Sequence, residues 1–269
     1  MSFDAPGTEP WVWAGNTYEE IVEVAGGDGS VLVMPIASLE QHGPHLPTAT
    51  DTILATAVAD RGAELATEAG VPVVVLPPVW SGYSPHHTPF GGTVTLRFET
   101  MLAALGDIAD SALGNGFDAL LVLNGHGGNG PLVSSTVSTV GERHPDVDVL
   151  GLTYWLLAAA AFNDDLRESD VGGASHGGEF ETSLMLALHP DLVREDRFRT
   201  EYYDQPYAMA NQDLTVRGHL SSYRPWTFYS ETGVGGDPTV ASAETGEALF
   251  AVLGDALSDL LVEIHETNR

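Results

Sequence analysis

One stretch that combines carboxylates and histidines, IASLEQHGPHLPTATD at 36–51, directly follows a run typical of a buried strand. Glu40 and His42 are two positions apart, so their side chains share a face of an extended segment. Asp51 follows a Gly/Pro-rich turn that can fold back on them. Because carboxylate oxygen and imidazole nitrogen are typical ligands of Zn and Mn, all three residues are candidate metal ligands. The alternative is that Asp51 or Thr50 only caps a helix, and that Glu40 and His42 are loop residues.

A second histidine motif, NGHGGNG at 124–130, also follows a strand-like run. Its glycines and the helix after them could bind a phosphate through backbone N–H groups. However, the motif lacks the Lys-Ser/Thr pair of a P-loop and the G-x-G-x-x-G spacing. Since glycine neighbours let a bulky ligand atom approach the backbone, we favour metal ligation by His126 over a nucleotide-binding loop.

A third motif, SHGGEFETS at 175–183, opens a helix and places His176 just before its first turn. Glu179 and Glu181 are two positions apart, so they project in different directions and are expected to have different roles. The alternative is that acidic residues here only stabilise the helix N-terminus, which could be the whole role of Glu181.

Two loops complete the candidate regions. WSGYSPHHTPFGGTVTL at 80–96 carries His86 and His87 beyond a predicted strand, where they either line a pocket or are exposed. TGVGGDPTVASAETGEAL at 232–249 is Gly-rich, with a turn at Asp237-Pro238, and local physics favours a loop followed by a helix.

Short apolar runs alternate with segments of helical periodicity. The runs expected to form buried strands are 30–37, 71–79, 119–125 and 148–155. The segments expected to form helices are 51–70, 98–116, 130–144, 179–190 and 242–267. This alternation predicts an α/β fold with a mainly parallel sheet covered by helices on both faces. Ligands bind beyond the carboxyl ends of such strands, so the motifs of Glu40 and His126 should meet at one sheet edge.

The composition limits the class of protein. The chain has 269 residues with 43% hydrophobic residues, and no linker or repeat divides it, so we expect a single domain over 1–269. Ten Lys+Arg face 38 Asp+Glu, a net charge of −28, which disfavours nucleic acid and anionic membranes as partners. The acids are scattered, and molar salt would screen their repulsion, so we hypothesise a halophilic cytosol. Without Cys, a signal peptide or a long apolar run, we expect a soluble cytoplasmic protein.

Five motifs in this order resemble the creatininase family of metal-dependent amidohydrolases: SLEQHGPHLPTATDT, YSPHHTPFGGTVTL, LLVLNGHGGN, HGGEFETS and GVGGDPTVASAETGE. The charge points to a haloarchaeal-type member. The resemblance implies a three-layer α/β/α sandwich, an oligomer that is often hexameric, and a two-metal centre with Zn or Mn, Fe also being acceptable. It places Glu40, His42, Asp51 and His126 in the ligand positions, with Asp51 bridging both ions.

The sequence departs from this family in one respect. Creatinine-hydrolysing members have His-Tyr-Glu-Asn after the second motif strand, and its Glu binds metal, whereas this chain has Gly at the corresponding position, 128. Glu179, in the HGGE shared by many members that do not act on creatinine, is the natural replacement. This difference puts creatinine itself in doubt. The resemblance further suggests substrate contacts by Ser84, His87 and Trp155, with Trp155 near the family's aromatic pocket lid.

Other branches resemble the chain at the same motifs: the deformylase of a formylaminopyrimidine nucleotide, and the peptidase that trims the mycofactocin precursor. All break a C–N amide bond, and two ions would activate water and polarise the carbonyl. The departing nitrogen needs a proton, for which we select His176, oriented or assisted by Glu181. The competing class is a non-hydrolytic protein that binds a phosphorylated ligand through its Gly-rich loops. A further alternative is a member that keeps the metal for a structural role.

Overall fold

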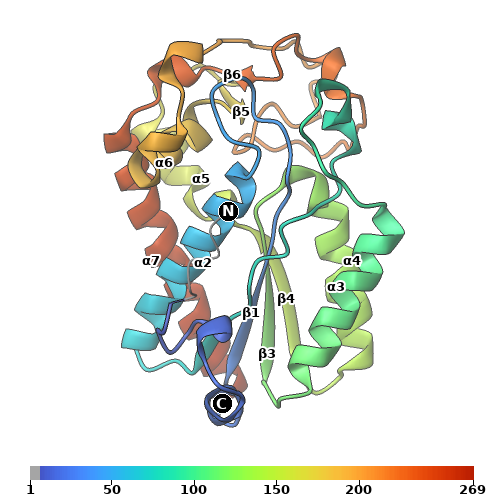
Figure 1. The fold of residues 1–269 in the computed structure, drawn as a ribbon, viewed down its shortest axis with the longest axis vertical. Coiled ribbons are helices and arrows are strands. Elements are labelled where there is room, and N and C mark those ends of the chain that lie inside the picture. The colour runs from blue at the N-terminus through green and yellow to red at the C-terminus, as the bar shows by residue number, and fades with distance from the viewer. Residues whose placement is uncertain (1–6) are drawn as a thin grey trace.

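The computed structural model describes residues 7–269, and a four-stranded parallel sheet lies at its centre (Figure 1). The strand order is β2-β1-β3-β4. The strands are β1 (Val31–Ile36), β2 (Val73–Val75), β3 (Ala119–Asn124) and β4 (Asp148–Thr153). The helices are α1 (Tyr18–Ala25), α2 (Thr50–Glu68), α3 (Phe98–Leu113), α4 (Gly130–Arg143), α5 (Ala159–Ala161), α6 (Glu179–Leu188) and α7 (Ala243–Asn268).

Helices cover both faces of the sheet, which confirms the expected three layers (Figure 1). Successive side chains of a strand point to opposite faces. Val31 and Val33 of β1 therefore join a buried cluster with α2, α6 and α7. Leu32 and Met34 join a second cluster with α1, α3 and α4. β1, β2 and β3 are buried along their whole length, as continuous apolar runs in a parallel sheet require. The edge strand β4 was also expected to be buried, but its residues are exposed or only partly buried, because no further strand covers that edge.

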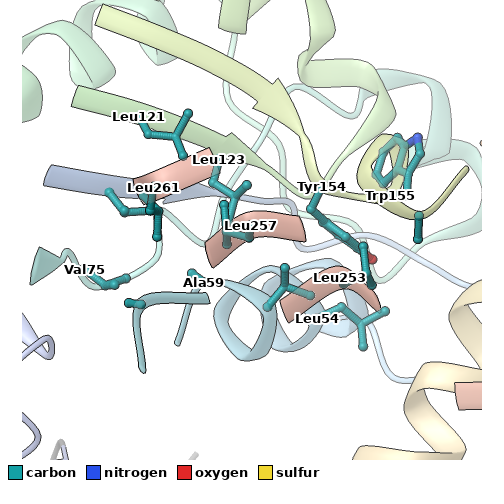
Figure 2. Close-up of a cluster of buried hydrophobic side chains, with 14 of the residues drawn as sticks. Leu54, Ala59, Val75, Leu121, Leu123, Tyr154, Trp155, Leu253, Leu257 and Leu261 are labelled. Atoms are coloured by element: carbon teal, nitrogen blue, oxygen red, sulfur yellow. The ribbon is translucent and has the colours of Figure 1, made fainter. Parts of the chain in front are cut away.

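Figure 2 shows the first cluster at the contact between α2 and α7. Leu54 of α2 lies close to Leu253 and Leu257 of α7, and all three are fully buried. Leu121 and Leu123 of β3 cover the cluster from the sheet side. This packing fixes α2 against the sheet, and its first turn carries Asp51.

Every strand and helix expected from the pattern is present, but one strand is much shorter than predicted. β2 comprises Val73–Val75 instead of 71–79. Pro77 and Pro78 lack backbone N–H groups and therefore interrupt the ladder of hydrogen bonds. The sequence pattern did not predict α1, whose capping box joins Thr17 and Glu20, the short helix α5, or a small antiparallel pair of strands.

The antiparallel pair consists of β5 (Ala174–His176) and β6 (Gly235–Gly236), and in Figure 1 it lies beyond the carboxyl ends of the parallel strands. It brings His176 and the Gly-rich loop at 232–236 to that edge. At the same edge, Ile36 of β1 pairs with Asn124 of β3, so the two strands end at the same level. None of the described helices combines the length and apolar character needed to cross a bilayer.

Candidate metal centre and active site

Asp51 lies at the centre of a buried group of carboxylates and imidazoles beyond β1 and β3. Its Oδ1 is 2.9 Å from Nε2 of His42, and its Oδ2 is 3.2 Å from Nδ1 of His126. Oε2 of Glu40 is also 3.2 Å from Nδ1 of His126. The structure thus brings together the four residues that the first two motifs supply.

Asp51 has no capping role. The N-cap of α2 is Ala49, which offers no side-chain hydrogen bond, and Asp51 is already inside the first turn with its carboxylate directed at the two imidazoles. Thr50 donates its hydroxyl hydrogen to the carbonyl of Pro47. The alternative in which Asp51 or Thr50 caps the helix and the others are loop residues is therefore wrong.

Hydrogen bonds on the far side of both rings direct a ring nitrogen of each imidazole at the carboxylates. Nδ1 of His42 is 3.2 Å from the carbonyl oxygen of Glu40, which only accepts, so this nitrogen is the donor. Nε2 of His126 likewise faces the carbonyl of Tyr83 at 3.2 Å and the hydroxyl of Ser84 at 2.9 Å. The opposite nitrogens, Nε2 of His42 and Nδ1 of His126, are then free to ligate a metal, as in known metal sites.

The two glutamates at the start of α6 diverge, and the structure corrects the prediction for Glu179. Both oxygens of Glu179 accept backbone N–H groups, from Glu168 at 2.8 Å and Ser169 at 2.9 Å. Glu179 therefore anchors the preceding loop and does not reach the metal cluster. Glu181 does: its Oε1 is 3.7 Å from Nε2 of His42, and its Oε2 accepts the N–H of Gly177.

The electrostatics of the cluster favour a bound positive charge. Burial lowers the pKa of His42 and His126, but neighbouring carboxylates outweigh it. Asp51 and Glu181 raise the pKa of His42 well above its ordinary value, and Glu40 and Asp51 raise the pKa of His126 to about 10. Burial raises the pKa of Asp51, but the two imidazoles hold it well below its usual range.

Several buried polar atoms in this cluster have no hydrogen-bond partner of good geometry among the described residues: Oε2 of Glu40, Nε2 of His42 and Oδ2 of Asp51. Buried polar atoms are normally paired, so each unpaired atom calls for an explanation such as an ion. Ligand atoms of Glu40, His42 and Asp51 lie within 4.8 Å of one another, and so do those of His42, His176 and Glu181. The donor set and its orphaned atoms fit divalent metal ions.

A second wall of the site consists of His176, His87 and Trp226. Nδ1 of His176 and Nε2 of His87 lie 3.8 and 3.4 Å from Oε1 of Glu40. Trp226 packs on both rings, with centroids about 5 Å away. Burial and neighbouring imidazoles lower the pKa of His176 and of His87 well below the ordinary value. His86 is half-buried and stacks on His126, and burial lowers its pKa to about 4.

Comparisons with known proteins identify the family of the chain. The family model described as creatinine amidohydrolase matches residues 15–261. The chain is a member of the creatininase family of hydrolases. It is 34% identical over 254 residues to the creatinine amidohydrolase of Pseudomonas putida, covering 89% of this chain and 91% of that protein. It is 32% identical over 228 residues to the mycofactocin precursor peptide peptidase of Mycobacterium ulcerans, covering 83% and 81%.

Solved structures of creatininase share the fold. A Mn form and a mutant of Zn-Zn type each align with a TM-score of 0.79 and 30% identity. Each alignment covers 95% of this chain and 98% of the creatininase chain. Membership of the creatininase family and the α/β fold predicted from the sequence are thus confirmed.

Position 128 has little space for a side chain in this structure. A Cβ at Gly128 would overlap Nε2 of His126 and the carbonyl of Tyr83, so a glutamate cannot stand here without rearrangement. The carboxylate that approaches the cluster from α6 is that of Glu181. No sequence signal separates it from Glu179, because both are acidic residues in the first turn of one helix.

The structure also corrects the prediction of a lid tryptophan. Trp155 is 1% exposed and packs in the hydrophobic core against Tyr154, as Figure 2 shows, so it cannot touch a substrate in this conformation. Trp226 stands at the site instead, in a segment for which the sequence predicts no element. Of the other predicted substrate contacts, His87 lines the cluster, and Ser84 holds His126 through its hydroxyl.

Gln41 is a further residue that sequence reasoning missed. Strict alternation along an extended segment would turn it away from Glu40 and His42, yet its side chain is buried between His87 and His176.

The surroundings of His126 argue against a phosphate-binding loop. The side chain of His126 is surrounded by carboxylates of Glu40 and Asp51, which would repel an anion.

Proposed function

We propose that this protein is a metal-dependent amidohydrolase that cleaves a C–N amide bond of a small-molecule substrate, a cyclic amide such as creatinine or a related compound. One observation carries the proposal: the two oxygens of Asp51 face imidazoles from two different loops, His42 and His126. A carboxylate in this position could contact two cations, one through each oxygen. The orphaned buried atoms around it support the same interpretation.

The residues fit two divalent ions, Zn or Mn, with Fe acceptable to the same N/O ligands. Glu40, Asp51 and His126 would hold one ion. His42, Asp51 and Glu181 would hold the other. When bound, such a pair supplies Lewis acidity for the amide carbonyl and lowers the pKa of a coordinated water.

Side chains of this protein would carry out the proton transfers. Burial and neighbouring imidazoles lower the pKa of His176, which favours its neutral form, and its Nδ1 lies 3.8 Å from Oε1 of Glu40. In this position it accepts a proton from the attacking water and returns it to the departing nitrogen, so that the C–N bond breaks as the new C–O bond forms. Trp226 covers the rings of His176 and His87 and excludes water from that side.

A specific observation keeps a peptide amide as the second candidate substrate. Position 128 is glycine and has no room for the carboxylate of the creatinine-hydrolysing motif. In addition, several relatives of comparable identity are mycofactocin precursor peptide peptidases. A formylaminopyrimidine nucleotide is the third amide to test. The bond broken is the same in each case, and the metal centre serves all of them.

The test begins with metal analysis of protein purified without added metal. It continues with an amide panel: creatinine, a formylaminopyrimidine nucleotide and short peptides, each with added Mn or Zn. We expect up to two equivalents of metal and hydrolysis of one substrate class. His126→Ala should lose metal and activity, whereas the matched variant His219→Ala, at an exposed histidine, should keep both. Protein that binds no metal and instead retains a nucleotide in chelator would overturn the proposal.

Two properties of the whole molecule are part of this proposal. The charge of −28 with no lysine supports a halophilic, cytoplasmic enzyme. The homo-oligomer, a hexamer by resemblance to the family, stays a prediction. Large apolar side chains such as Tyr18, Met209 and Tyr223 are more than half exposed and are compatible with contacts between copies.

A further inference from the structure

The orientation of the Gln41 side-chain amide is fixed by two backbone groups. Its Oε1 accepts the N–H of Gly43 at 2.9 Å, and its Nε2 donates to the carbonyl of Gly233 at 3.0 Å. Both backbone groups have a fixed polarity, so exchanging O and N would oppose donor to donor and acceptor to acceptor. A Cβ at Gly233 would overlap this amide, which gives the Gly-rich loop a defined role at the site.

Nε2 of Gln41 also lies 2.9 Å from Nδ1 of His87 and 3.1 Å from Nε2 of His176. One of its two hydrogens is used by Gly233, so only one remains. Nε2 of His176 is 2.6 Å from the backbone carbonyl of Gln41, which can only accept. This nitrogen therefore carries a hydrogen and cannot accept a second one from the amide. The remaining amide hydrogen goes to Nδ1 of His87, which must present a lone pair.

The two rings consequently present opposite polarity to the same carboxylate oxygen. With Nδ1 as acceptor, His87 carries its hydrogen on Nε2, which is 3.4 Å from Oε1 of Glu40. With Nε2 as donor, neutral His176 carries its lone pair on Nδ1, 3.8 Å from the same oxygen. The rings stack 4.2 Å apart at 24°. One imidazole is thus a donor toward the cluster, and its neighbour is an acceptor.

This polarity decides whether a third ion can bind. Ligand atoms of Glu40, His87 and His176 lie within 4.8 Å of one another, close enough to hold a cation. A metal ligand needs a lone pair on the ring nitrogen, however, and Nε2 of His87 is protonated while Gln41 donates to its other nitrogen. The amide of Gln41 therefore keeps His87 out of the ligand set.

We infer that Gln41 is a positioning residue that makes His87 a hydrogen-bond donor and His176 a proton acceptor on the same wall of the site. Only the use of the two rings, with His87 donating to the developing oxyanion and His176 accepting a proton, rests on the proposed hydrolysis. The tautomers themselves do not depend on it. Trp226 extends the network outward, because its Nε1 donates to the same Gly233 carbonyl at 2.9 Å.

NMR spectroscopy can determine the tautomers of His87 and His176 directly. Long-range ¹H–¹⁵N spectra are recorded on metal-free protein labelled in its histidines, and the signals are assigned with His87→Asn and His176→Asn. The spectra should show that, in His87, Nδ1 is unprotonated and Nε2 is protonated. Gln41→Glu replaces the donor by an acceptor, so Nδ1 of His87 should gain a proton. The matched Gln212→Glu, which loses one amide bond to Ala210 away from the cluster, should change neither ring.

Activity gives the second measurement. Gln41→Met should keep the two-ion content and lower kcat by about 10- to 100-fold, with a smaller effect on KM, because the lost groups orient the rings and do not hold the metals. A native spectrum in which Nδ1 of His87 is protonated would overturn the inference, even if Gln41→Glu does not fold. Unchanged tautomers in a folded Gln41→Glu protein would also overturn it. An inactive protein with the expected tautomers would contradict only the proposed function.

Discussion

At the scale of single residues, the site depends on which side of a helix a carboxylate occupies. Glu179 and Glu181 are separated by roughly 200° around α6, at 3.6 residues per turn. Glu181 consequently faces His42, and Glu179 faces the loop that contains Glu168 and Ser169. Both residues are glutamates, but Glu181 is a candidate metal ligand and Glu179 anchors a loop.

This division gives a matched pair of variants. Glu181→Gln removes a charged oxygen near His42, so the affinity for Mn or Zn should fall by at least the roughly 10- to 100-fold typical of outer-shell partners. Glu179→Gln turns an amide hydrogen toward a backbone N–H, so the free energy of unfolding should fall by about 1–3 kcal/mol while the metal still binds. Titration calorimetry with metal-free protein and thermal unfolding measure both effects. Equal losses of metal affinity would contradict the assignment.

At the scale of elements, α6 is held in place by its close crossing with α7. Gly246 lies in the first turns of α7, and a Cβ there would overlap the backbone carbonyl of Ser183 in α6. The backbone N–H of Ser242, the N-cap of α7, also donates to the hydroxyl of Ser183. The position of α6, and with it that of Glu181, thus depends on a glycine far from the chemistry.

We therefore expect Gly246→Ala to destabilise the fold by about 1–3 kcal/mol, as overpacking of a close contact does. The matched control is Gly141→Ala on α4, where a Cβ would meet only Val149, at 3.8 Å. In the control, the better helix propensity of alanine should leave stability unchanged or raise it by up to about 1 kcal/mol. Urea unfolding of both variants measures the difference. A Gly246→Ala protein as stable as the control would show that the crossing tolerates a methyl group.

At the scale of the whole molecule, the dominant property is the surplus of acidic residues. With 38 Asp+Glu against 10 Lys+Arg, repulsion between carboxylates opposes the compact state in dilute buffer. The screening length falls from about 10 Å at 0.1 M salt to about 3 Å at 1 M, so salt should relieve most of this repulsion.

The melting temperature should therefore rise as KCl increases from 0.1 to 2 M, to an extent of several degrees or more. Scanning fluorimetry or circular dichroism over a salt series measures it, and the same series with sucrose controls for a general cosolvent effect. A melting temperature that is independent of salt would argue against the halophilic interpretation.

The sequence alone determined the architecture and most of the candidate ligands. Periodicity identified the four parallel strands and all of the longer covering helices, but not α1, because the spacing of apolar residues reflects the period of an element most clearly over several turns. The ends of β1 and β3 then placed Glu40, His42 and His126 at one edge of the sheet, since parallel strands expose their carboxyl ends together.

Only the tertiary structure determined the rotation of α6 and the contacts between residues far apart in the sequence, because the local residue pattern does not encode them. The rotation of α6, which selects Glu181 over Glu179, follows from its packing on α7. The contacts of Gln41 with His176 and Gly233 join residues 135 and 192 positions apart, and no short-range period reports such contacts. For the same reason the sequence does not show that Trp226, in a short 3-10 turn, packs on the histidines of the site, whereas Trp155 is buried in the core.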